Sequence, residues 1–216
     1  MNAPLTDDLL QQLRADGLPR IASQLGVAPA QVDEAAAAAL PLLLGAMGRN
    51  ARDPRGADAL YGALAHDHRG LDPGNVLGTV LGGGMDGTGI LRHVLGRREP
   101  LAAQTLGAIG GLGQDRASML LRMLAPVVMA YLARRVFTPA DAAGRETPAP
   151  TPQGLAGALD REEREMRSRE GFGGGLLSML DRDDDGDVDL QDFVRGGGAA
   201  PLDVQTAEMR SPRPLL

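Results

Sequence analysis

Apolar side chains recur at helical spacing through the first 136 residues of the chain. The segments ADALYGALAHD and GILRHVLGRR show this spacing most clearly, at Leu60, Tyr61, Ala63 and Leu64, and at Ile90, Leu91, Val94 and Leu95. Glycine and proline, which end or interrupt helices, separate such segments. No stretch alternates apolar and polar positions convincingly, as a half-buried strand would. The pattern predicts an all-α fold in which residues 1–136 form one compact multi-helix domain.

Residues 21–47 and 106–132 share a layout of a short helix, a glycine turn and a long apolar helix with a proline inside it. Gly26 and Pro41 of the first segment align with Gly111 and Pro126 of the second. A proline removes one backbone hydrogen bond and bends its helix. We therefore expect the two bent helices to pack against each other or against the same core. Chance similarity between two Ala- and Leu-rich helices would give the same match.

The composition changes after residue 136. The stretch FTPADAAGRETPAPTPQG is rich in Pro, Ala and Thr, which predicts a linker at residues 137–154. Next, LAGALDREEREMRSRE predicts a charged helix with Glu–Arg pairs at four-residue spacing. We place this helix and the acidic stretch that follows it in one segment, residues 155–196. Residues 197–216 predict a disordered tail.

The bulk composition excludes several classes of protein. Apolar residues make up 43% of the chain, enough for a core, and the absence of cysteine excludes disulfides and thiolate metal sites. At the N-terminus, Asp7 and Asp8 stand where an export signal would be basic. The most apolar stretch, MLLRMLAPVVMAYLARR, contains Arg122 and falls short of about 20 uninterrupted apolar residues. We expect a buried helix there, no membrane span, and a cytoplasmic protein.

The stretch DRDDDGDVDLQD, residues 181–192, holds seven aspartates and one arginine, which together account for the whole net charge of −6. Carboxylates packed this closely repel one another unless solvent or a cation neutralises them. Their order matches the calcium-loop pattern D-x-[DN]-x-[DN]-G, with Gly186 at the sharp turn. The predicted ligands are Asp181, Asp183, Asp185, Asp187 through its carbonyl, Asp189 and Asp192. An acidic solvated tail is the alternative interpretation.

Two features of this loop indicate weak binding. The last ligand is Asp192 where a longer glutamate is usual, so bidentate coordination is harder and the preference for calcium over magnesium narrows. The helices that could flank the loop are short, and the chain holds no second loop of this kind. A lone, short-flanked loop favours a structural or docking element over a sensor that opens a hydrophobic groove.

Two motifs that suggest nucleotide or DNA binding have simpler explanations. GGGMDG, at 82–87, satisfies G-x-G-x-x-G, but a dinucleotide site needs a preceding strand, so an interhelical turn is the better interpretation. IASQLGVAPAQV resembles the start of a helix-turn-helix. The helix that follows it, AQVDEAAAAAL, offers neither arginine nor a row of polar groups for DNA. We therefore expect no nucleic-acid partner, and a DNA binder is the third hypothesis.

The alternative hypothesis is that the protein is an enzyme whose site includes the histidines. His66 and His68 flank Asp67, and His93 is the one other histidine. If the fold brought them together with carboxylates such as Asp86, they would form a dispersed catalytic site. No nucleophile is paired with a base in the sequence, and neither a Walker loop nor a G-x-S-x-G motif is present. The sequence therefore leans against an enzyme without deciding the question.

The segments GADALYGALAHD, GTGILRHVLG, LAAQTLGAIGGL and LLRMLAPVVMAYLARR resemble the bacterial family called domain of unknown function 937, over residues 5–136. The pattern G-x-G-I-L-x-H-V-L-G is the most specific of these. The resemblance implies a compact helical fold and a C-terminal Gly-rich stretch with an acidic loop. It implies no activity.

The leading hypothesis joins these observations. The sequence predicts a non-catalytic helical protein with a divalent-cation loop that takes calcium, with magnesium as the alternative ion. We expect it to act by association with another protein or with itself.

Overall fold

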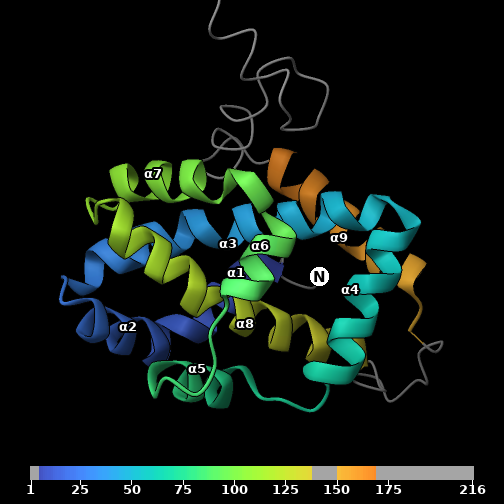
Figure 1. Ribbon diagram of the computed structural model, residues 1–216, viewed down its shortest axis with the longest axis horizontal. Helices are drawn as coiled ribbons and strands as arrows, with labels where there is room; N and C mark the ends of the chain where they lie inside the picture. Colours follow the sequence, from blue (N-terminus) through green and yellow to red (C-terminus); the bar gives the residue numbers. More distant parts are fainter. Residues whose placement is uncertain (1–4, 138–149, 169–216) are drawn as a thin grey trace, which may run out of the picture. The chain divides into compact units, whose positions relative to one another are not determined.

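The computed structural model describes residues 5–137 and 150–168 of the chain. Every regular element in these residues is helical, which confirms the predicted all-α fold (Figure 1). In chain order the elements are α1 (Leu5–Gln12), η1 (Leu13–Gly17), α2 (Leu18–Leu25), α3 (Pro29–Arg52), α4 (Pro54–Asp67), α5 (Pro73–Leu81), α6 (Thr88–Val94), η2 (Gly96–Arg98), α7 (Glu99–Ile109), α8 (Gln114–Phe137) and α9 (Pro152–Ser168).

Local sequence signals set where several helices begin. The side chain of Asp53 accepts a hydrogen bond from the Arg55 N–H at 2.8 Å, and that of Asp72 accepts one from the Gly74 N–H at 2.9 Å. The residue after each aspartate is a proline, whose missing N–H costs nothing in the first turn of a helix. Asp-Pro therefore marks the starts of α4 and α5.

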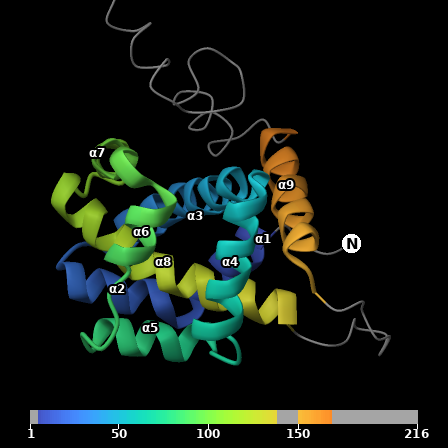
Figure 2. The same ribbon diagram turned by 45° about the vertical axis from the view of Figure 1, so that its right-hand side comes forward.

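The core of the fold is built on α3 and α8, which contact each other and lie in the middle of the helices (Figures 1 and 2). An unbroken run of residues is buried in each, 38–48 in α3 and 123–133 in α8. Both runs are mostly Ala, Leu, Val and Met, and Tyr131 is the one aromatic residue in them. The predicted burial of the two proline-containing helices is confirmed.

The structure confirms the shared layout of the two segments. The short helix α2 leads through Gly26, with φ of 64°, into α3, and α7 leads through Gly111, with φ of 62°, into α8. A positive φ favours glycine, which explains why both turns use it. Both long helices have 24 residues, and Pro41 and Pro126 each follow the helix start by 12 positions (29 to 41 and 114 to 126).

The turn of α8 around Pro126 is packed closely against the start of α6. Because proline has no N–H, the carbonyl of Arg122, four residues earlier, lacks its usual helical donor. Gly87 lies against this carbonyl, and an added Cβ at Gly87 would overlap the oxygen and come within 2.9 Å of Pro126 Cδ. Position 87 therefore has room only for glycine.

In the described part of the chain, α8 is the single helix that is long and apolar enough by itself to cross a membrane, with a mean hydropathy of 1.3. Of that apolar window, 78% is buried inside the fold. The bent pair of helices Leu5–Leu25 and Pro29–Arg52 passes the same test if it is taken as one broken span. The burial of α8 is that of a core helix, as the sequence predicts.

Helix α9 packs against α3 and α4 (Figure 2). Its apolar side chains Leu155 and Leu159 are buried, and Leu159 lies beside Gly48 of α3. From the sequence we expected this helix in a segment that begins at residue 155, after the linker. The helix begins at Pro152, where the Thr151 hydroxyl accepts a hydrogen bond from the Gly154 N–H at 3.0 Å.

Candidate functional site

The predicted cation ligands Asp181, Asp183, Asp185, Asp187, Asp189 and Asp192 lie outside the described residues. Their arrangement stays a prediction. Among the residues that the structure does describe, no group of three or more histidines and carboxylates could hold a metal ion.

The three histidines do not meet. His66 lies in the last turn of α4 and His68 ends that helix, where its ring Nδ1 lies 3.3 Å from the carbonyl of Ala63. His93 is in α6, and its carbonyl accepts a hydrogen bond from the Asn50 amide at 3.2 Å. Asn50 lies just before the start of α4, whereas His66 and His68 lie at its end. The 14 residues of α4 separate its two ends by about 20 Å.

Asp67 and Asp86, the two carboxylates proposed to join the histidines, also lie in different parts of the fold. Asp67 is exposed beside His66, whereas Asp86 precedes α6 and accepts a hydrogen bond from the Thr88 hydroxyl at 2.6 Å. That hydrogen bond is the largest cause lowering the pKa of Asp86. The described residues therefore give no support to the dispersed catalytic site.

The two nucleotide and DNA motifs are interhelical turns. GGGMDG connects α5 to α6, as predicted, with Gly83 at a φ of 76°. The helix-turn-helix segment is α2, the Gly26 turn and α3, and the helical stretch 5–25 meets α3 at 112°. From residue 38 to residue 48 α3 is buried in the centre of the fold, so this part of the helix is not available to a DNA groove.

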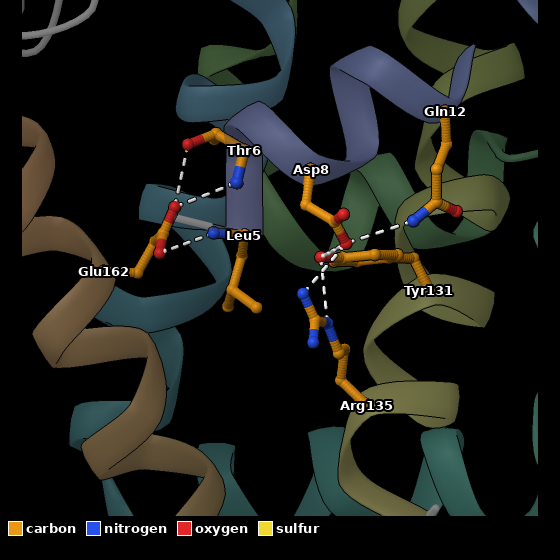
Figure 3. Close-up of polar contacts among 7 residues, drawn as sticks. All are labelled: Leu5, Thr6, Asp8, Gln12, Tyr131, Arg135 and Glu162. Atoms are coloured by element: carbon orange, nitrogen blue, oxygen red, sulfur yellow. Dashed lines mark hydrogen bonds and ion pairs between the residues drawn. The ribbon is translucent and has the colours of Figure 1, made fainter. Parts of the chain in front are cut away.

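A polar cluster that the sequence analysis does not identify joins α1 to α8 (Figure 3). The hydroxyl of Tyr131 donates to Asp8 Oδ2 at 2.7 Å and accepts from Arg135 Nε at 3.0 Å. Arg135 also donates to Asp8 at 2.8 Å, and Gln12 donates to the same oxygen at 3.0 Å. One carboxylate thus gathers donors from both helices.

The environment fixes the protonation of this cluster. The hydrogen bond from Tyr131, aided by Arg135, lowers the pKa of Asp8 below its ordinary 3.8. Burial, followed by the hydrogen bond to Asp8, raises the pKa of Tyr131 well above its ordinary 10.0. Tyr131 is only 2% exposed and stays neutral, so it is unsuited to be a catalytic base. The cluster binds two helices together.

A second polar contact joins α1 to α9. The carboxylate of Glu162 accepts the backbone N–H groups of Leu5 and Thr6, each at 2.9 Å, and the Thr6 hydroxyl at 2.8 Å (Figure 3). These are among the first N–H groups of α1, which have no acceptor within the helix. Glu162 therefore caps α1 from a helix more than 150 residues away, and it is only 5% exposed.

Glu163, the next residue, pairs with α3. Its side chain is 2% exposed and lies 3.0 Å from Arg52 in the last turn of α3. The four-residue spacing of Glu and Arg in this helix predicted ion pairs within the helix, not a partner in α3. The available signal for the burial of Glu163 is the pair of leucines at 155 and 159, which puts an apolar side on an otherwise charged helix.

The chain is similar to known proteins at the level of a family model. No curated protein and no solved structure matches the chain. A family model described as "Bacterial protein of unknown function (DUF937)" matches residues 7–135, from α1 through most of α8. The match covers more than half of the chain and includes both halves of the internal repeat. The chain belongs to this family.

Proposed function

We propose that the protein is a non-catalytic helical module that binds a divalent cation at residues 181–192 and acts by associating with another protein or with itself. The ion is calcium, with magnesium as its competitor. The observation that carries the proposal is the spacing of the aspartates, which places oxygen donors at alternate positions before and after Gly186. Membership of the family adds no activity.

The described residues supply further support. Buried polar groups of the described residues join helices: Glu162 of α9 caps α1, and Tyr131 of α8 donates a hydrogen bond to Asp8 of α1. His66, His68 and His93 occupy different places in the fold. A module whose polar interior serves structure fits a binding role better than a catalytic one.

Titration calorimetry of the intact protein with calcium and with magnesium tests cation binding. We expect a dissociation constant on the order of 10⁻⁵ to 10⁻³ M, because Asp192 is a poor bidentate ligand. Asp181→Ala combined with Asp185→Ala should abolish the heat. Asp184→Ala is the matched control, since its position in the loop pattern is not a ligand position. Absence of heat at millimolar ion would mean that the segment is an acidic, solvated stretch.

Sedimentation velocity tests association separately. The intact protein is run at several concentrations, with calcium and with a chelator. If the protein associates with itself, calcium should promote a larger sedimenting species. If it associates with another protein, that partner is first isolated by calcium-dependent affinity purification. The purified partner, mixed with the protein again, should then bind it in calcium. Unchanged sedimentation, together with no calcium-dependent pure partner, would contradict the association part and leave cation binding standing.

A further inference from the structure

We draw no further inference here: the strongest candidate, the surface of α1, α3 and α4 that Leu155, Leu159 and Glu162 of α9 cover, is occupied by the chain's own helix, and nothing in the described part of the structure shows what else would cover it.

Discussion

Glu162 and Thr6 form two hydrogen bonds across 156 positions of the chain, one to the backbone N–H and one to the hydroxyl of Thr6. Both residues are buried, Glu162 at 5% and Thr6 at 7% exposure. The N-terminus of α1 therefore depends on a helix that lies beyond the residues matched by the family model. The stability of α1 and that of α9 should be coupled.

Replacing Glu162 tests that coupling. Glu162→Ala leaves two backbone donors and a hydroxyl buried without an acceptor, so we expect a loss of about 2 kcal/mol in the free energy of unfolding. Glu162→Gln keeps an acceptor and should lose less. Urea denaturation measures the loss, and amide exchange should report faster opening in α1. The exposed Arg161→Ala is the control and should change stability little. If Glu162→Ala behaves like this control, the cap does not stabilise the fold.

Acid should weaken the Asp8 cluster. The folded pKa of Asp8 is lowered from 3.8, chiefly by the Tyr131 hydroxyl, so the folded state binds its proton less readily than the unfolded state. This contribution to stability is present above pH 3.8 and is lost as the pH falls through the lower, folded value. The difference in the free energy of unfolding between the wild type and Asp8→Asn should therefore decrease as the pH falls below 3.8. Urea denaturation at a series of pH values measures this difference.

The control for this pH dependence is Asp58→Asn, at an exposed position of α4. It should stay within about 0.5 kcal/mol of the wild type at neutral pH. A gap between wild type and Asp8→Asn that is constant from neutral pH down to pH 2 would show that the carboxylate charge of Asp8 contributes nothing.

Alkali should leave Tyr131 neutral while the fold persists. Burial and then the Asp8 hydrogen bond raise its pKa above 10.0, whereas the unfolded tyrosine ionises near that value. The free energy of unfolding should therefore decrease as the pH rises above 10. In Tyr61→Phe, where Tyr131 is the one remaining tyrosine, tyrosinate absorbance should appear only with unfolding. Ionisation near pH 10 with an intact circular dichroism spectrum would contradict this account.

Two glycines of the same short region should respond in opposite directions to alanine. Gly87→Ala places a Cβ against the Arg122 carbonyl and Pro126, where both neighbours are backbone or ring atoms, so we expect a loss of about 1 to 3 kcal/mol. Gly89 in α6 has no atom within 4 Å of its added Cβ, so Gly89→Ala should stabilise by about 0.5 kcal/mol. Thermal unfolding of the two variants measures both effects. Equal effects would mean that the close approach at Gly87 is relaxed in solution.

The features that sequence reasoning predicted have local signatures. Pro41, Pro126, Gly26 and Gly111 reveal the repeat because proline and glycine have conformational preferences that do not depend on distant residues. The apolar run around Pro126 likewise predicts a buried helix, although its composition also passes the test for a membrane span.

The features that it missed depend on distant partners. Nothing near Glu162 indicates that its acceptor oxygens meet Leu5 and Thr6, since side-chain burial there is set by where α9 packs. The same holds for Asp8 and Tyr131, which are 123 positions apart. Leu155 and Leu159 give α9 an apolar side, but no local feature shows which distant groups its charged side chains will meet.

The cap on α1 also has a consequence for synthesis of the protein. The ribosome makes Leu5 and Thr6 first, and Glu162 follows 156 residues after Thr6. At about 5 to 20 residues per second, roughly 8 to 30 seconds pass before the carboxylate exists. During that interval α1 can form only with exposed donors at its N-terminus. Packing of α9, after its synthesis, therefore supplies the cap that α1 lacks until then.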